Sequence, residues 1–309
     1  MVTRVGMLGM SDGNGHPFSF SAIINGYSDN GMRHSGWPGI YDYVRRRHGS
    51  EFGVGDLRVT HAWTQDAEQT AALCRATSIS HAVSSPTDML GVVDAVIIAR
   101  DDHASHRPLA MPFLEAGIPV FIDKPLTLDL DELRWFTPYL ESGLLMSCSG
   151  MRYAKELDAW RAGQIDHGEM RLVRGTIVND WERYGVHLLD AILPLMPSRP
   201  ISVSALPAAH DSLIVVMGDG VPVHIDALGQ VPAMFRVELM SSHHISCFDI
   251  TDNFSMFRRT LWAFWRQIVD GHPAIPAVET VDVIRTLIAG KLALQNRKEV
   301  SLGGFDNLL

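Results

Sequence analysis

Two short apolar runs decide the fold of this chain: Val93-Asp94-Ala95-Val96-Ile97-Ile98-Ala99 and Val120-Phe121-Ile122-Asp123-Lys124-Pro125. Both are rich in Val and Ile, and residues 108–116 between them have helical character and end at Gly117. Strand, crossover helix and strand in this order are typical of a parallel sheet. The stretch therefore predicts a βαβ unit.

Lys124 ends the second run at the point where a buried strand leaves its sheet. In open α/β sheets, ligands bind outside the carboxyl ends of the strands, so this position predicts that Lys124 lies at the mouth of a cleft. Pro125 favours an extended backbone at Lys124. A charged residue that simply ends a strand is the plainer interpretation, and the pattern alone leaves both open.

The spacing from His106 to Asp123-Lys124-Pro125, with an apolar helix and Ala116-Gly117 between them, resembles the Gfo/Idh/MocA family of nicotinamide-dependent sugar and cyclitol oxidoreductases. The family carries Glu-Lys-Pro where this chain has Asp123. The resemblance implies a Rossmann-type parallel sheet in residues 1–150. It implies an α+β domain with a large, mostly antiparallel sheet in residues 151–309, whose C-terminal helix packs back on the first domain. It also places His106, Asp123 and Lys124 at the cofactor.

A glycine-rich turn follows the first predicted strand, residues 4–8, and precedes a short apolar helix. Dinucleotide-binding folds hold the pyrophosphate at such a turn through backbone N–H groups and the helix N-terminus. The spacing is not G-x-G-x-x-G, because Ser11 and Asn14 stand at the second and third glycines, and a plain turn would also explain it. We expect Asp12 to turn away or to cap the helix. The candidate cofactor residues here are Gly9, Met10, Ser11, Gly13 and Asn14.

Three further segments of the first domain bear on the cofactor. Residues 27–55 are expected to form an inserted loop, either a lid or an oligomer contact. The second strand ends at Thr64-Gln65, without the acid that binds an adenosine ribose, and the missing positive charge leans slightly to NAD over NADP. The fourth strand is followed by Arg100 and Asp101 in a loop that departs from the family's Thr-Pro-Asn. Thr64 and Asp101 remain cofactor candidates.

The second half of the predicted site is a helix within residues 180–190, after the first strand of the second domain. Arg183, His187 and Asp190 are spaced to share one helical face. A packed core histidine is the plainer interpretation, but Gly185-Val186-His187-Leu188-Leu189-Asp190 matches the family's Gly-x-His-x-x-Asp segment, which implies a catalytic histidine. The family often carries an arginine where this chain has Arg152, which we expect to contact substrate.

Oxidation of a secondary alcohol sends a hydride to the nicotinamide and releases the hydroxyl proton. A histidine can accept that proton at neutral pH, and a cation beside the oxygen stabilises developing negative charge. We therefore predict His187 as acid/base and Lys124 as the positioning cation, with Asp190 orienting or structural. Many family members carry Asp at the position of Arg183. In this chain Tyr184 or Asp180 could take the part of that missing carboxylate in the proton relay. Arg183 could instead bind an anionic part of the substrate.

Composition limits the class of protein. A net charge of −9 without a Lys/Arg block argues against nucleic-acid binding. Three dispersed cysteines suggest neither a disulfide framework nor a metal site, and no apolar stretch reaches the roughly 20 residues of a membrane span. With no leader pattern after Met1, we expect a cytoplasmic protein that binds no membrane. The resemblance implies a homodimer or homotetramer.

Three hypotheses follow. The first is an NAD(P)-dependent oxidoreductase that acts on a hydroxyl or keto carbon of a sugar, polyol or sugar derivative. The second is a cofactor-binding regulator of the same fold without turnover, suggested by the irregular first loop. The third is an NAD-dependent lyase or glycosidase that oxidises its substrate only transiently.

Overall fold

The computed structural model describes residues 2–164 and 166–308. The chain divides into two compact units. The first holds residues up to 126 together with 138–147 and 257–275, and the second holds 127–137, 148–256 and the residues from 276 onward. The domain boundary near residue 150 stays a prediction. The long C-terminal helix that was expected to pack back on the first domain is grouped with the second unit.

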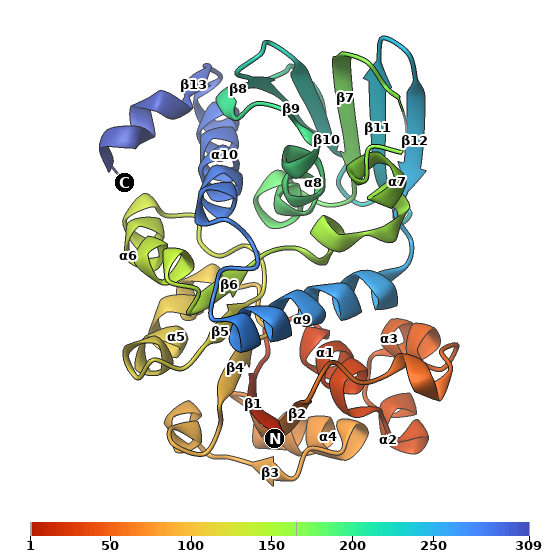
Figure 1. Cartoon of the computed structure of the whole chain (residues 1–309), viewed down its shortest axis with the longest axis vertical. Coiled ribbons are helices and arrows are strands. Elements are labelled where there is room, and N and C mark those ends of the chain that lie inside the picture. Colours follow the sequence, from red (N-terminus) through yellow and green to blue (C-terminus); the bar gives the residue numbers. More distant parts are fainter. Residues whose placement is uncertain (1, 165, 309) are drawn as a thin grey trace. The chain divides into compact units, whose positions relative to one another are not determined.

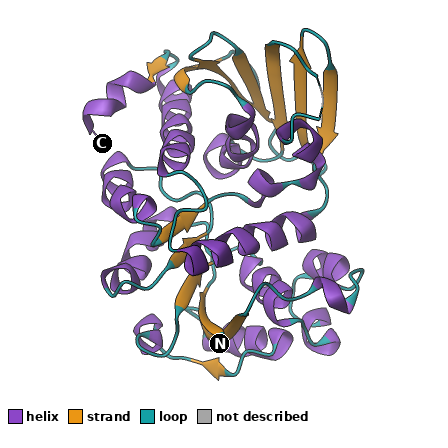
Figure 2. Ribbon diagram, viewed as in Figure 1, coloured by secondary structure: helices purple, strands orange, loops and turns teal. Residues whose placement is uncertain are grey.

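The first unit contains a six-stranded parallel sheet in the order β3-β2-β1-β4-β5-β6 (Figure 2). The predicted Rossmann-type sheet is confirmed. Every residue of the fourth and fifth strands is buried, as expected where both faces of a parallel sheet are covered. The strands are β1 (Thr3–Leu8), β2 (Leu57–Trp63), β3 (His81–Ala82), β4 (Ala95–Ile98), β5 (Val120–Ile122) and β6 (Leu145–Ser147).

The strand order reverses beside β1, which pairs with β2 on one side and β4 on the other. Ligands of open α/β sheets bind at such a switch point. Apolar helices complete this unit, and Phe121 of β5 packs on Phe20 and Phe264. The helices are α1 (His16–Asn25), α4 (Ala67–Thr77), α5 (His106–Glu115) and the part of α9 (Asn253–Asp270) from Phe257, while α6 (Leu130–Glu141) spans both units.

The segment 27–55 is not the plain loop that we expected. It forms α2 (Asp29–Arg33), α3 (Pro38–Val44) and the 3-10 turn η1 (Gly49–Glu51) (Figure 1). Ser28 caps α2 by accepting the Gly31 N–H, and Pro38 begins α3. Helices of five and seven residues are too short for a clear 3.6-residue apolar period, which is why the pattern missed them.

The second unit contains a seven-stranded sheet in the order β12-β11-β7-β10-β9-β8-β13. Among its described strand pairs only β10 and β7 run parallel, which confirms the mostly antiparallel prediction. The strands are β7 (Met170–Ile177), β8 (Pro200–Ala205), β9 (Asp211–Met217), β10 (Pro222–Ala227), β11 (Phe235–Ser241), β12 (Ile245–Asp249) and β13 (Val300–Ser301).

Two helices pack on this sheet: α8 (Val186–Ile192) on β7 and β11, and α10 (Ala277–Asn296) on β8 and β9. Figure 1 shows α10 running beside β8. A π-helical turn, η6 (Trp181–Gly185), leads into α8. Shorter elements are η4 (Gly150–Tyr153), η5 (Lys155–Leu157), α7 (Asp158–Arg161), η7 (Leu193–Leu195) and η8 (Leu302–Leu308) in this unit, and η2 (Pro86–Met89) and η3 (His103–Ser105) in the first.

Trp181 is fully buried and joins the π-helical turn to α10. Its indole N–H donates to the Leu287 carbonyl at 2.9 Å, and its ring covers Gly290 so closely that a Cβ there would lie 2.4 Å from ring atoms. The absence of a side chain at Gly290 therefore sets how near α10 comes to the turn that precedes His187.

We predict that Gly290→Ala lowers the free energy of unfolding by about 1–3 kcal/mol, because the added methyl overpacks against the Trp181 ring. Gly39→Ala is the matched control, since Gly39 lies in helix α3 and a Cβ there meets no atom within 4 Å. Alanine is the better helix former, so that variant should be neutral or slightly more stable. Urea unfolding of both variants tests this, and equal stabilities would contradict the packing account.

Candidate functional site

The predicted cofactor residues of the first unit lie at the carboxyl ends of four neighbouring strands. The loop from Gly9 follows β1, Thr64-Gln65 follows β2, Arg100-Asp101 follows β4 and Asp123-Lys124 follows β5. Because parallel strands end at the same edge of a sheet, these segments converge on one side of it. The hydrogen bonds between them show that they meet.

The loop after β1 has the close packing of a cofactor cradle. A Cβ on Gly9 would lie 2.5 Å from Pro17 Cγ, and one on Gly15 would lie 2.6 Å from both Trp37 and Ile40. Gly13 has φ +75°, which favours glycine, and its Cβ position is open space. The loop enters α1, a ten-residue helix that begins at His16. This geometry fits a dinucleotide pyrophosphate held at a helix N-terminus.

The insertion contributes to this cradle, because Trp37 and Ile40 are the residues that press on Gly15. The side chain of Asp12 is exposed and does not cap α1, whose N-cap is Gly15 without a side-chain bond. The first of the two expectations for Asp12, that it turns away, is the one that fits.

The end of β2 carries no acid that could bind a ribose; Gln65 there instead holds the loop after β1. Gln65 Oε1 accepts the Met10 N–H at 3.0 Å, and Gln65 Nε2 donates to the Met10 carbonyl. Thr64 is buried, and its hydroxyl donates to the Asp66 carbonyl at 2.6 Å. Both side chains are thus engaged with the protein, and contact of Thr64 with a cofactor stays a prediction.

Ser11 joins the cofactor loop to the end of β4. Its hydroxyl donates to Asp101 Oδ1 and accepts the Asp101 N–H at 3.0 Å. The other carboxylate oxygen of Asp101 lies 3.9 Å from Lys124 Nζ. The Lys124 side chain is 7% exposed and the Lys124–Pro125 peptide is cis. Asp101 therefore faces both the loop and the predicted positioning cation.

Asp123 contacts two residues at the end of the cofactor loop, Asn14 and His16. Its Oδ2 accepts Asn14 Nδ2 at 3.1 Å and lies 2.5 Å from His16 Nδ1. Burial acts to raise the pKa of Asp123, but the positive charge and hydrogen bond of His16, the charge of Lys124 and the Asn14 bond outweigh it and lower that pKa well below its usual range. Asp123 is thus a buried, ionised carboxylate.

His106 is the first residue of α5 and is fully buried. Its Nδ1 lies 2.9 Å from the Leu126 carbonyl and its Nε2 lies 3.1 Å from the Arg100 carbonyl. Burial lowers its pKa, opposed by these two hydrogen bonds. The imidazole thus links the segment after Lys124 to the end of β4, and its direct contact with a cofactor stays a prediction.

In the second unit, Ser149 connects two of the predicted site residues. Its hydroxyl lies 2.6 Å from His187 Nδ1, and its backbone N–H donates to Asp190 Oδ2 at 2.7 Å. The hydroxyl also accepts the Met151 N–H at 3.2 Å. Ser149 follows β6 and precedes η4, so the end of one strand positions the imidazole on α8.

Asp190 and Arg152 form a buried ion pair. Arg152 Nη1 lies 3.2 Å from Asp190 Oδ1, and its other terminal nitrogen bonds Glu279 of α10. Burial raises the pKa of Asp190 to about 6, although the Arg152 charge and the Ser149 N–H act to lower it. The Arg152 guanidinium therefore links Asp190 on α8 to Glu279 on α10. Contact of Arg152 with substrate stays a prediction.

The raised pKa of Asp190 predicts a pH dependence of stability. An acid whose pKa rises from 3.8 unfolded to about 6 folded stabilises the fold when protonated, and this contribution is lost as pH rises from 4 through 6. The free energy of unfolding of the wild type, relative to Asp190→Asn, should fall by about 3 kcal/mol over that window. Urea unfolding at pH 4, 5, 6 and 7 measures it; a difference independent of pH would contradict the buried-acid account.

His187 and Asp190 lie on α8 and both contact Ser149, whereas Arg183 lies in the preceding π-helical turn. Arg183 is exposed, His187 is half-buried and Asp190 is buried. Asp180 Oδ1 accepts the Arg183 N–H at 3.0 Å, so it caps the turn. The Tyr184 ring lies 5.2 Å from the His187 ring, so Tyr184, one of the two expected substitutes for the missing carboxylate, packs beside the imidazole.

Residues 40–141 match the family model described as "Oxidoreductase family, NAD-binding Rossmann fold". The resemblance to the Gfo/Idh/MocA family is confirmed. No curated protein matches this sequence significantly.

Solved structures share the fold of nearly the whole chain. Myo-inositol 2-dehydrogenase from Lactobacillus plantarum is 14% identical with a TM-score of 0.76, covering 97% of this chain and 99% of that one. Scyllo-inositol dehydrogenase from Lactobacillus casei, with NAD(H) and scyllo-inositol, is 13% identical with a TM-score of 0.73; the match covers 98% of this chain and 100% of that one. Myo-inositol dehydrogenase from the same species, with NAD(H) and myo-inositol, is 13% identical at 0.74, covering 97% of each chain. At these identities the likeness shows the fold.

Sequence reasoning missed three residues of the candidate site, namely His16, Gln65 and Ser149. His16 follows the glycine-rich turn directly, so its place at the start of a helix beside a cofactor loop was the available signal. Gln65 was noted only as a residue that does not discriminate between cofactors. Ser149 stands at the end of a strand, the position that marked Lys124.

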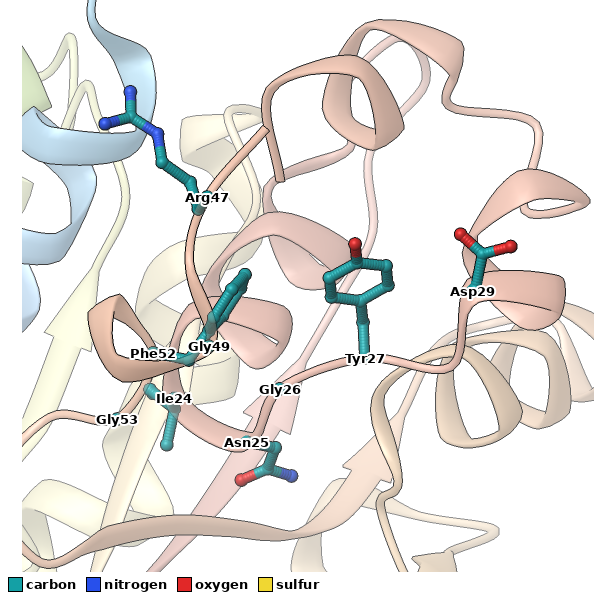
Figure 3. A pocket seen from close by; sticks show the side chains of 9 residues that line it. All are labelled: Ile24, Asn25, Gly26, Tyr27, Asp29, Arg47, Gly49, Phe52 and Gly53. Atoms are coloured by element: carbon teal, nitrogen blue, oxygen red, sulfur yellow. The ribbon is translucent and has the colours of Figure 1, made fainter. Parts of the chain in front are cut away.

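A separate pocket of about 580 Å³ lies between the insertion and the end of α1 (Figure 3). The rings of Tyr27 and Phe52 line it with centroids 5.6 Å apart, while Arg47 pairs with Glu51 at 3.5 Å. Asn25 bonds the Val59 and Thr77 carbonyls. Arg47 and Asn25, two of its polar side chains, thus have protein partners.

Within residues 2–164 and 166–308, no group of three or more His, Cys, Asp and Glu side chains could hold a metal ion. No helix in the same ranges is long and apolar enough to cross a membrane.

Proposed function

We propose that this protein is an NAD(P)-dependent dehydrogenase that acts on the CH–OH group of a sugar, cyclic polyol or sugar derivative. One observation carries the proposal: Lys124, nearly buried, ends β5 among the residues that hold the glycine-rich cofactor loop. The match of residues 40–141 to an NAD-binding oxidoreductase family supports it, as does the shared fold of three inositol dehydrogenases.

The cofactor loop would hold the dinucleotide through the backbone of Gly9–Asn14 at the start of α1. A bound nicotinamide supplies the acceptor or donor of the hydride. Lys124 would donate a hydrogen bond to the reacting oxygen and stabilise its negative charge in the transition state, and Asp101 at 3.9 Å orients the ammonium group. The missing positive charge at the end of β2 gives only the slight preference for NAD over NADP stated above.

His187 would accept the hydroxyl proton during oxidation and return it during reduction. Ser149 Oγ, 2.6 Å from Nδ1, would accept a hydrogen bond from the Nδ1–H and thereby present Nε2 as the proton acceptor. Tyr184 packs beside the imidazole, and Asp190 acts as a positioning residue through Ser149. The proton path therefore differs from one that uses a carboxylate at position 183.

The exposed Arg183 supports a substrate with an anionic group, because a guanidinium binds carboxylate or phosphate in bidentate fashion. Titration with sugar acids and sugar phosphates beside their neutral parents tests this preference. Arg183→Gln should weaken binding of the anionic compounds and leave the neutral ones unchanged.

A screen of NAD and NADP reduction at 340 nm with cyclitols, sugars, sugar acids and sugar phosphates tests the proposed activity. Substrate-dependent formation of NADH or NADPH is the expected result. Saturable cofactor binding without any reduction would favour the regulator of the same fold. Product formation without a net change in absorbance would favour the lyase or glycosidase.

We also propose that the protein is a homodimer or homotetramer assembled through the large sheet of the second unit. The edge strand β12 supports this, because Ile245 on it is 75% exposed. Light scattering tests the proposal, and a monomer at micromolar concentration would contradict it.

A further inference from the structure

Two carboxylates, Asp123 and Asp101, lie beside the loop that would bind an anionic dinucleotide. Asp123 is a buried, ionised carboxylate that accepts a hydrogen bond from Asn14, a residue of the loop that would receive an anionic dinucleotide. Asp101, bonded to Ser11, is a second carboxylate on the same loop. Two negative charges so close to a pyrophosphate site would oppose binding unless positive charges balance them.

Each carboxylate has a basic side chain close to it. Lys124 Nζ lies 3.9 Å from Asp101 Oδ2, and His16 Nδ1 lies 2.5 Å from Asp123 Oδ2. The second distance is that of a direct hydrogen bond, which becomes charge-assisted when the imidazole is protonated. His16 is therefore the group that directly faces the more deeply buried carboxylate.

The surroundings of His16 hold its imidazole in place. It is the first residue of α1, and its ring lies 5.1 Å from that of Phe20 and 4.8 Å from that of Phe257. A protonated imidazole at the start of a helix would oppose the helix dipole, so it would need a nearby anion. Asp123 is that anion.

We propose that His16, in its protonated form, is the counter-charge of Asp123 and makes the loop able to hold an anionic dinucleotide. This inference rests on the proposed function and adds a cofactor-site residue to it. Asn14 supplies a neutral hydrogen bond to the same carboxylate oxygen, so charge is the contribution that only His16 makes from the loop.

The test is a fluorescence titration with NADH and NADPH, read through energy transfer from the tryptophans, of which Trp37 packs against Gly15 of the loop. His16→Phe removes both charge and donor, whereas His16→Asn retains a donor near the position of Nδ1. We expect both to raise Kd about tenfold, which corresponds to about 1.4 kcal/mol. The exposed His272→Asn in the same unit should bind like wild type.

The decisive variant is the double substitution His16→Phe with Asp123→Asn. Because an amide at position 123 needs no counter-charge, its Kd should return to within about threefold of the wild-type value. A double variant as weak as His16→Phe, or a His16→Asn protein that binds like wild type, would overturn the charge role. Circular dichroism and thermal unfolding verify that each variant is folded.

The titration also separates this inference from the proposed function. If the wild type binds neither NADH nor NADPH, both fail. If the wild type binds and His16→Phe binds equally well, the dehydrogenase proposal stands and the role of His16 is wrong.

Discussion

Lys124→Met should lose turnover by about 10²–10³-fold while the protein still binds its dinucleotide. Methionine keeps most of the volume of lysine but places no charge beside the reacting oxygen, so the transition state loses its stabilising cation. The measurement is the initial rate of NADH formation with the best substrate of the screen, together with the NADH titration.

Lys298→Met is the matched control, because Lys298 is an exposed lysine after α10. It should retain the wild-type rate and Kd. A Lys124→Met protein that turns over at the wild-type rate would remove Lys124 from the chemistry. Loss of cofactor binding as well as turnover would instead make its effect one of loop structure, through Asp101.

His187→Asn should lower the rate by about 10²–10⁴-fold near neutral pH, because no other group would accept the hydroxyl proton. Asparagine retains an amide near the position of Nδ1, where Ser149 Oγ lies 2.6 Å away, but it has nothing at Nε2. The variant therefore separates the proton acceptor from the bond that orients it. Initial rates across pH 6–10 should show that the wild-type dependence on a base is lost.

Ser149→Ala tests the orienting bond itself. It should lower the rate by about tenfold, which is roughly the net worth of one hydrogen bond. His244→Asn, an exposed histidine of the same unit, should have no effect. If His187→Asn were as active as this control, the proton acceptor would have to be another group, with Tyr184 the first to examine.

The sequence allowed most of the first sheet to be predicted because its strands are short, apolar and regularly separated by helices. The run 93–99 and the run 120–122 became β4 and β5 within two residues at each end. The insertion was harder, since α2 and α3 depend on local caps at Ser28 and Pro38 and show no long apolar period. The parallel pairing of β7 with β10 is set by tertiary contacts that no local pattern records.

Site residues could be predicted where a sequence motif marks them. They could not be predicted where the role of a residue depends on contact with a residue that is distant in the sequence. Lys124 stood out because it ends a buried strand. His16 could not be paired with Asp123, 107 residues away, before the ends of β1 and β5 were seen to meet. Likewise, the spacing that linked His187 to Asp190 could not show that Ser149 contacts both, because Ser149 comes from a distant part of the sequence.

The most direct test of the central claim is the transfer of deuterium from substrate to cofactor. The protein is incubated with NAD or NADP and a ring-deuterated cyclitol or sugar from the screen, and the cofactor is then analysed by mass spectrometry. We expect reduced cofactor that carries one deuterium, formed by the wild type and lost in Lys124→Met and His187→Asn. A protein that binds the cofactor yet transfers no deuterium from any such substrate would contradict the central claim.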